Sequence, residues 1–202
     1  MIPVLSLDME DPLEFIEKYG SFEVVKFGHN LAIFGKKMLD RLSDMDLKII
    51  VDLKFCDIPS TVARSVKSWD HPSVIGFTVH SLCGIESVRA AVENTSKHVF
   101  SVIKLTSQPG NMKDYMTTIE KIESLGGSFV LPGKWATALR EKIRGAFLVP
   151  GIRISVPSFD QRDTVTLDEI KDAADYAVLG REIYLSSDPK AKIEEVRRLC
   201  GS

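Results

Sequence analysis

Hydrophobic side chains are gathered in short runs that recur from one end of the chain to the other. The runs are rich in Val, Ile, Leu and Phe, and they are nearly continuous rather than strictly alternating with polar residues. Such runs are typical of parallel strands that are buried on both faces. We therefore predict eight parallel strands, at residues 2–7, 23–28, 47–54, 73–79, 99–105, 128–131, 146–150 and 175–180.

Amphipathic stretches with helix punctuation separate these runs. Asp11 and Pro12 open the first, because an aspartate can cap a helix and proline suits its first position, and Gly20 closes it. The last helix begins at Pro189, after Asp188, and carries apolar residues at helical spacing. The other helices are predicted at residues 31–42, 61–69, 85–92, 112–125, 135–143 and, on the weakest pattern, 167–174.

The regular alternation of strand and helix favours an α/β fold, a compact (β/α)8 TIM barrel that forms a single domain over residues 1–202. A doubly wound open sheet is the alternative, because alternation alone does not tell a closed sheet from an open one. No Gly-x-Gly-x-x-Gly follows any predicted strand, so the dinucleotide-binding fingerprint is missing. The connection at residues 151–166 is long for a compact domain, and loops of that length are usually lids or binding segments.

The composition is that of a globular protein, and it argues against two classes of partner. The chain has 202 residues, of which 44% are hydrophobic, and a net charge of −2. Nucleic-acid binding usually needs a strongly basic face, so we expect no nucleic-acid partner. The apolar runs are too short to cross a bilayer, and the first residues lack the regions of a signal peptide. We therefore expect no membrane partner and a cytoplasmic location.

The cysteines and histidines favour neither disulfides nor a metal site. Cys56, Cys83 and Cys200 are odd in number and widely spaced, which fits neither a disulfide framework nor a zinc knuckle and suggests a reducing setting. Cys56 has acidic and apolar neighbours, so we interpret it as a small packing residue rather than a nucleophile. The histidines show no metal-binding spacing such as His-Glu-x-x-His.

Polar residues stand at the carboxyl ends of the predicted strands, where parallel barrels place their chemistry. Lys26 is the most informative, because an isolated lysine within an apolar strand is costly unless it is paired. The alternative is that Lys26 points outward and extends its ammonium group into solvent. The other polar positions at strand ends are Asp8, Asp52, Lys54, His80, Ser81, Thr106, Ser107, Gly180 and Arg181.

The densest group of polar residues is the run DLKFCDIPST at residues 52–61. Asp52 and Lys54 are two apart on a strand and share a face, which is the barrel interior if Leu53 faces the helices. Asp57 follows in a loop. Asp52 and Lys54 beside Lys26 would form a strongly coupled charge cluster, which marks functional sites more often than structural ones. A structural ion-pair network is the alternative.

Together these residues resemble the orotidine 5'-phosphate decarboxylase family. The resemblance rests on Asp8 in LSLD, Lys26 in VVKFG, the D-x-K-x-x-D-I-P-x-T run and GR at residues 180–181, and it extends over the whole chain in the same order. PGIR at residues 150–153 and DQR at residues 160–162 resemble the family's phosphate-side motifs. Lys26 discriminates within the wider superfamily, because the magnesium-dependent sugar-phosphate decarboxylases and hexulose-phosphate synthases typically have a glutamate near that position.

The resemblance implies decarboxylation of orotidine 5'-monophosphate to UMP, a step of de novo pyrimidine biosynthesis, with no metal and no other cofactor. Lys54 would protonate C6 of the pyrimidine as CO2 leaves. Asp52 would lie beside the substrate carboxylate, with Lys26 between it and the ribose, and Asp8 would bind a ribose hydroxyl.

The resemblance also implies a homodimer, in which Asp57 and Thr61 reach into the active site of the second subunit. Loop 108–111 is either a turn or a lid over the base. The further binding residues implied are Thr106 and Ser107 at the pyrimidine edge, and Arg153, Gln161, Gly180 and Arg181 at the 5'-phosphate.

A few positions depart from the family's usual pattern, all on the phosphate side. Asp163 follows Arg162, which puts a phosphate role for Arg162 in doubt, and Glu182 and Leu167 stand where proline is common. Two alternatives to the decarboxylase stay open. One is a magnesium-dependent sugar-phosphate decarboxylase or aldolase of the same superfamily, and the other is a non-catalytic phosphate-binding barrel.

Overall fold

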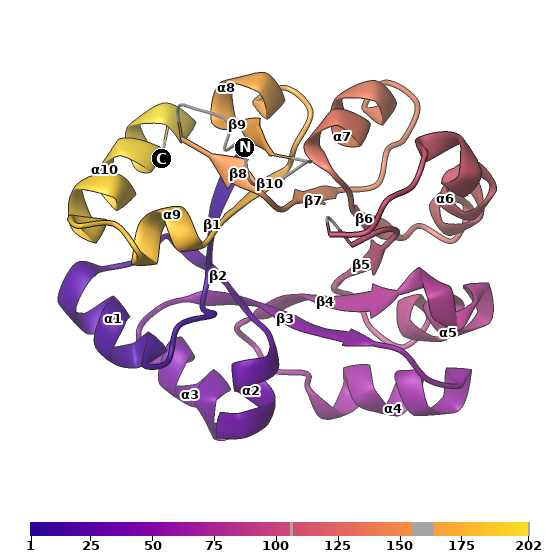
Figure 1. Ribbon diagram of the computed structural model, residues 1–202. Coiled ribbons are helices and arrows are strands. Elements are labelled where there is room, and N and C mark those ends of the chain that lie inside the picture. Colours follow the sequence, from indigo (N-terminus) through magenta and orange to yellow (C-terminus); the bar gives the residue numbers. More distant parts are fainter. Residues whose placement is uncertain (106, 155–163, 202) are drawn as a thin grey trace.

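The computed structural model describes residues 1–105, 107–154 and 164–201. Its centre is a closed barrel of parallel strands in the order β1-β10-β7-β6-β5-β4-β3-β2 (Figure 1). Each strand coincides with or overlaps one of the eight apolar runs, so the predicted (β/α)8 barrel is confirmed. The barrel strands are β1 (Ile2–Ser6), β2 (Val24–Phe27), β3 (Lys48–Phe55), β4 (Val74–His80), β5 (His98–Val102), β6 (Ser128–Val130), β7 (Phe147–Val149) and β10 (Tyr176–Leu179).

Closure of the barrel depends on the first strand. Val4 in β1 is the register partner both of Val24 in β2 and of Val178 in β10. Because the first and last barrel strands are paired, the sheet has no open edge. This pairing excludes the doubly wound open sheet.

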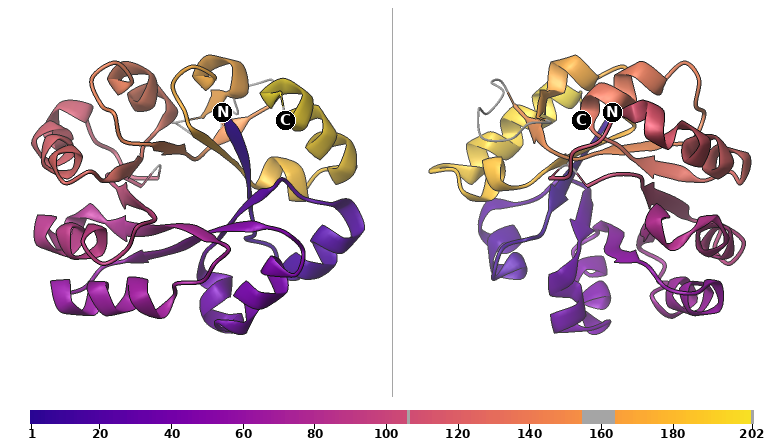
Figure 2. Two further views of the ribbon diagram at one scale, coloured as in Figure 1. Left: turned by 180° about the vertical axis from the view of Figure 1, so that it is seen from behind. Right: turned by 45° about the vertical axis from the view of Figure 1, so that its right-hand side comes forward.

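The helices form an outer layer around the barrel, and both chain termini lie close together beside it (Figure 2). Among the described residues, every helix is too short or too polar to cross a bilayer. The helices are α1 (Pro12–Tyr19), α2 (His29–Phe34), α3 (Lys37–Ser43), α4 (Pro59–Ser68), α5 (Ile85–Val92), α6 (Met116–Ser124), α7 (Gly133–Leu139), α8 (Leu167–Ile170), α9 (Arg181–Tyr184) and α10 (Pro189–Cys200), with single 3-10 turns η1 (Ser81–Cys83) and η2 (Met112–Tyr115).

The structure differs from the predicted elements in several places, including α9, which was not predicted. The helix predicted at 31–42 is two helices, because Gly35 adopts a φ of 78° and its N–H closes α2 on the carbonyl of Leu31. Asp11 does not cap α1 with its side chain. Within the 151–166 connection, β8 (Ile152–Arg153) pairs with β9 (Val165–Thr166), and strands this short leave no periodic signal in a sequence.

Two apolar layers fill the fold. The larger lies between the strands and the helices. A smaller cluster fills the barrel interior around Phe100, and Gly76 makes room for it, since a Cβ there would lie 2.7 Å from Cε2 of Phe100. The interior cluster consists of Val4, Val24, Ile50, Phe100, Leu148 and Val178.

Two cysteines are paired, contrary to the prediction. Cys56, which follows β3, forms a disulfide with Cys83 in η1, and their Cα atoms are 5.3 Å apart. The two residues are 27 positions apart in sequence, so their spacing did not predict the pairing. They meet because β3 and β4 are neighbours in the barrel, which places the loops after these strands side by side. Cys56 is therefore an exposed, disulfide-bonded residue, and its interpretation as a small packing residue is wrong. Cys200 is free and partly buried.

Candidate active site

Strand alternation carries the barrel interior from apolar to polar side chains. On each of three adjoining strands the residue two positions after an interior apolar side chain is polar: Ser6 follows Val4, Lys26 follows Val24, and Asp52 follows Ile50. Because residues two apart share a face, these polar side chains also point into the barrel, nearer the carboxyl ends of the strands. The carboxyl end of the barrel is therefore a polar pocket above an apolar floor.

The centre of this pocket is a carboxylate between two ammonium groups. One oxygen of Asp52, Oδ2, accepts a hydrogen bond from Nζ of Lys26, and the other, Oδ1, lies 3.0 Å from Nζ of Lys54. The exposed fractions of the side chains are 6% for Asp52, 12% for Lys26 and 32% for Lys54. Lys26 therefore lies inside the barrel and does not extend outward into solvent.

Burial and charge act in opposite directions on this cluster. Burial acts to raise the pKa of the Asp52 carboxyl, but the charges and hydrogen bonds of Lys26 and Lys54 outweigh it and hold that pKa below its usual value. Burial likewise acts to lower the pKa of Lys26, but the charges of Asp52 and Asp8 outweigh it, and that pKa is raised. The cluster therefore favours an ionised Asp52 and a protonated Lys26.

Thr78 in β4 joins the cluster, although the sequence analysis did not select it. Its buried hydroxyl donates to Oδ1 of Asp52 at 2.9 Å and accepts from the backbone N–H of Lys54, also at 2.9 Å. Lys54 has a φ of 47°, in the left-handed region that is rarely occupied by residues other than glycine. The sequence could have indicated Thr78, because it lies two residues after Gly76 and therefore on the inward-facing side of β4.

Asp8 and Tyr184 stand beside Lys26 at the mouth of the barrel. Oδ2 of Asp8 accepts a hydrogen bond of 2.5 Å from the hydroxyl of Ser6. Burial and the charge of Asp8 raise the pKa of the Tyr184 phenol. Gly28 lies close to the Asp8 and Asp52 carboxylates: a Cβ placed on it would be 3.3 Å from the backbone O of Asp52, 3.7 Å from Oδ2 of Asp52 and 3.8 Å from Oδ1 of Asp8.

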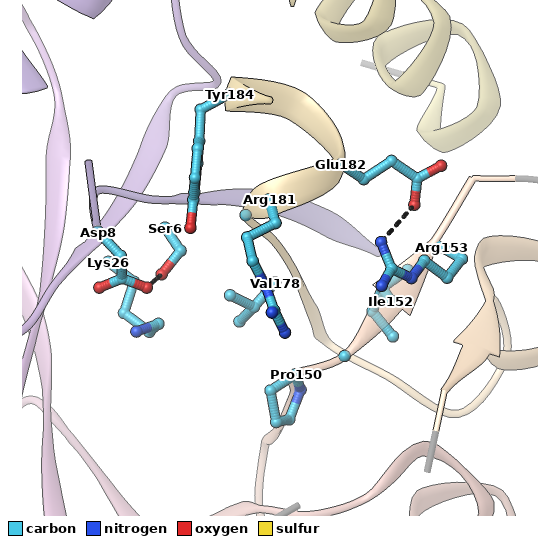
Figure 3. Close-up of a pocket in the computed structure, with 12 residues that line it drawn as sticks. Ser6, Asp8, Lys26, Pro150, Ile152, Arg153, Val178, Arg181, Glu182 and Tyr184 are labelled. Atoms are coloured by element: carbon cyan, nitrogen blue, oxygen red, sulfur yellow. Dashed lines mark hydrogen bonds and ion pairs between the residues drawn. The ribbon is translucent and has the colours of Figure 1, made fainter. Parts of the chain in front are cut away.

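A cavity of about 270 Å³ opens next to these residues (Figure 3). Asp8 and Lys26 lie at one side of it, Arg153 at the other, and the Arg181 side chain extends between them. Its size and its two arginines suit a small anionic ligand. The cavity is lined by Ser6, Asp8, Lys26, Pro150, Gly151, Ile152, Arg153, Val178, Gly180, Arg181, Glu182 and Tyr184.

Glu182 brings a negative charge to the arginine side of the cavity. Its Oε1 accepts from the N–H of Ile154 at 3.1 Å, and its Oε2 lies 3.7 Å from Nη1 of Arg153. This residue stands where the family commonly has proline, and here it holds Arg153 beside the start of α9. Arg153 therefore faces the cavity already paired with a carboxylate.

Other predicted residues lie outside the charge cluster. Asp57 is exposed in the loop after β3, and its Oδ1 accepts from the N–H of Ile58 at 2.7 Å. Thr61, in the first turn of α4, accepts from Nη2 of Arg64 at 3.2 Å. Ser107 is exposed in the loop after β5. Thr106, Gln161 and Arg162 lie outside the described residues.

The loop after β5 is fastened by a lysine that the sequence analysis also missed. Lys104 is buried, and its Nζ donates to the carbonyl of Gln108 at 2.5 Å. The same ammonium lies over the ring of Trp135, 5.7 Å from its centroid. Lys104 follows the inward-facing positions of Phe100 and Val102, which was the signal available in the sequence.

Metal donors are not gathered at this site. Within residues 1–105, 107–154 and 164–201, no three His, Cys, Asp or Glu side chains are grouped so that they could hold an ion. The two oxygens of Asp52 are each occupied by an ammonium group. Its chemistry in this arrangement is that of a counter-ion to two lysines.

Comparison of the sequence with known proteins identifies a family and several relatives. The profile of the orotidine 5'-phosphate decarboxylase / HUMPS family matches residues 2–196. The chain is 64% identical to an orotidine 5'-phosphate decarboxylase of Thermotoga maritima over 199 residues, 98% of this chain and 99% of the relative. It is 30% identical to an enzyme of the same name from Aquifex aeolicus, over 96% of this chain and 91% of the relative.

Solved structures agree with this result. The crystal structure of the orotidine 5'-phosphate decarboxylase of Thermotoga maritima superposes with a TM-score of 0.90 at 63% identity, over 98% of both chains. The orotidine 5'-monophosphate decarboxylase of Methanocaldococcus jannaschii, complexed with the inhibitor BMP, superposes with a TM-score of 0.80 at 22% identity, over the whole of both chains. At that identity the likeness concerns the fold.

Proposed function

This chain belongs to the orotidine 5'-phosphate decarboxylase / HUMPS family, and on that premise we propose that it converts orotidine 5'-monophosphate to UMP and CO2 without a metal ion. The reaction is a step of pyrimidine biosynthesis, for which we propose a cytoplasmic location. The observation that carries the proposal is the Asp52 carboxylate held between the ammonium groups of Lys26 and Lys54, beside a cavity lined by arginines.

The chemistry needs a fixed positive charge next to one ring carbon. When the bond between C6 and the carboxylate breaks, its electron pair stays in an sp2 orbital on C6, with no adjacent carbonyl to delocalise it. A preorganised ammonium can stabilise that charge in a site that excludes water. Lys54 then gives a proton from Nζ to C6, CO2 leaves, and the neutral amine takes up a proton from solvent.

Asp52 has a different role in this proposal. Its carboxylate holds the two ammonium groups close together against their mutual repulsion, and it keeps Lys26 charged against the effect of burial. Placed beside the substrate carboxylate, it also raises the energy of the bound substrate relative to the state in which CO2 has departed.

The nucleotide would lie across the mouth of the barrel. Asp8 would bind a ribose hydroxyl at the side where Lys26 lies, and the 5'-phosphate would occupy the cavity between Arg153 and Arg181. Binding energy from a phosphate remote from the reacting carbon can be used to lower the barrier of the chemical step. The remaining contacts in the proposal are Gly180 and Gln161 at the phosphate, and Thr106 or Ser107 at the pyrimidine edge.

Loss of orotidine 5'-monophosphate absorbance, followed with purified protein in EDTA, tests this function directly. We expect full turnover in the chelator, because each Asp52 oxygen already accepts a hydrogen bond from an ammonium group. A hexulose 6-phosphate with added magnesium serves as the control substrate for the metal-dependent members of the family. Turnover of that sugar alone, or a nucleotide that stays intact unless magnesium is added, would refute the proposal.

A homodimer completes the site in this proposal, with Asp57 and Thr61 contributed across the interface. Both residues follow β3 at the carboxyl end of the barrel, where the Asp57 carboxylate accepts from the N–H of Ile58 and the Thr61 hydroxyl accepts from Arg64. Exposed apolar side chains occur on the connections that follow the neighbouring strands β2, β3 and β4: Ile33 is 78% exposed, Ile58 63% and Leu82 71%. Exposed apolar side chains on adjoining connections favour burial against a second protein surface.

Mixed dimers test the exchange of Asp57. We expect Lys54→Ala and Asp57→Ala homodimers to be inactive. A heterodimer with one substitution in each subunit, isolated through two different affinity tags, should regain about half of the wild-type activity per dimer, since a twofold axis leaves one site intact. If Asp57 served its own subunit, both sites of the heterodimer would carry a defect and the activity would stay absent.

A further inference from the structure

We propose that Thr78 is a positioning residue for the decarboxylation, whose single hydroxyl fixes the Asp52 carboxylate and the Lys54 backbone relative to one another. The inference rests on the proposed function and adds to it a residue on β4 with its own task. Thr78 is 1% exposed, and its hydroxyl hydrogen-bonds Asp52 and Lys54, so it acts through these two residues.

The hydrogen bonds of the hydroxyl define its orientation. A threonine hydroxyl has one proton to donate and lone pairs to accept with. The Thr78 hydroxyl donates a hydrogen bond to Oδ1 of Asp52 and accepts one from the N–H of Lys54, and both are 2.9 Å long. A buried hydroxyl that both donates and accepts a hydrogen bond is held in one rotamer, and it restricts the motion of both partners.

The pairing of β3 with β4 explains why a side chain is needed here. Val51 is the register partner of Phe77, and the next pair is Phe55 with Val79. Three residues of β3, numbers 52–54, therefore stand opposite Thr78 alone. In such a bulge the regular ladder is interrupted, and the extra residues bend the strand and re-aim their side chains. The Thr78 hydroxyl accepts the hydrogen bond that a ladder carbonyl would otherwise take from Lys54.

The same bulge accounts for the backbone of Lys54. A φ of 47° costs a residue with a side chain free energy, and such conformations persist only where the surroundings enforce them. Thr78 supplies part of that enforcement through the Lys54 N–H. In this conformation the Lys54 ammonium reaches Oδ1 of Asp52, two residues earlier on the same strand.

The Asp52 carboxylate is oriented by the same contact. Its Oδ1 receives both Thr78 and Lys54, while its Oδ2 receives Lys26. A carboxylate can rotate about its bond to Cβ. The hydrogen bond from Thr78 stops this rotation and so fixes which carboxylate oxygen each lysine contacts. The geometry of the two ammonium groups toward the substrate thus depends on a residue that touches no substrate.

The test compares Thr78→Val, which keeps the shape and removes the hydroxyl, with Thr78→Ser, which keeps the hydroxyl. For Thr78→Val we expect kcat to fall about 100-fold, as for a misplacement of about 1 Å. The Kd for UMP should change less than about threefold, because the arginine cavity is untouched. Thr78→Ser should retain kcat within about fivefold of wild type, since the hydroxyl restores both hydrogen bonds.

The pH profile supplies a readout that a purely structural residue would not change. A hydrogen bond donated to a carboxylate stabilises its ionised form, so its loss raises the pKa of Asp52. The acid limb of kcat/KM should therefore move to higher pH in Thr78→Val and stay in place in Thr78→Ser. Ser101→Ala is the matched control, because this buried hydroxyl on β5 has no hydrogen-bond partner among the described residues.

The outcomes separate this inference from the proposed function. A wild-type protein that leaves orotidine 5'-monophosphate intact would refute the function. An active wild type with an equally active Thr78→Val variant, or with equal losses in the Val and Ser variants, would refute the role of Thr78 alone. If Thr78→Val does not fold, Thr78→Cys, whose thiol is a weak donor, decides the matter, because its kcat should lie well below that of Thr78→Ser.

Discussion

Replacement of Lys54 by alanine is expected to lower kcat/KM for orotidine 5'-monophosphate by at least about 10^4-fold, which combines the loss of a general acid with that of a preorganised charge. Lys26 cannot take over, because its side chain is only 12% exposed and its ammonium is held on Oδ2 of Asp52. The absorbance assay with enzyme in saturating excess measures the single-turnover rate, and we expect this rate to fall in the Lys54→Ala variant. The Kd for UMP should change far less.

Lys48 offers a matched control on the same strand. It is an exposed lysine at the start of β3, at the opposite end from the charge cluster. Lys48→Ala removes the same side chain from the same strand and should leave turnover unchanged. Substantial decarboxylation by Lys54→Ala, above a few per cent of wild type, would show that another group delivers the proton and would overturn the assignment.

Replacement of Asp52 by asparagine is expected to have the second largest effect, on activity and on stability together. The change leaves the largely buried Lys26 and the partly exposed Lys54 without their shared counter-ion. Breaking a buried ion pair by removing one partner costs about 3–5 kcal/mol of stability, and urea unfolding at pH 7 measures it. We expect kcat to fall by about 10^3-fold or more, because Lys54 loses both its orientation and its electrostatic support.

The pH dependence of stability provides a separate check on Asp52. Its pKa in the folded protein lies below the usual value, so the wild type gains stability from this group above its unfolded pKa and loses it as pH falls through the folded pKa. Asp52→Asn should lack this contribution, so its stability should fall less than that of the wild type on acidification. A variant that is destabilised and still fully active would instead support the structural ion-pair network.

Much of the architecture was predictable from local pattern. Near-continuous apolar runs such as 146–150 indicate buried parallel strands, because strands covered on both faces carry few polar positions. Alternation then placed Asp52 and Lys54 on one face, and the cost of an unpaired lysine indicated that Lys26 needed a partner. These inferences use residues a few positions apart, and the structure brings the three side chains together.

Other features depended on which segments meet in space. Barrel closure required β1 to pair with β10, and the Cys56–Cys83 disulfide required the loops after β3 and β4 to be neighbours. The salt bridge of Glu182 with Arg153 joins residues on different connections. Periodicity describes only the face on which a residue lies along its own element, so none of these contacts follows from it.

The chain alone thus determined the eight barrel strands, the polar residues at their carboxyl ends and the family resemblance. The tertiary structure decided how those residues are oriented. The bulge that sets three β3 residues against Thr78, and with it the left-handed backbone of Lys54, arises from the register between two strands. Register is settled by the packing of whole strands against one another, and a single strand's sequence does not encode it.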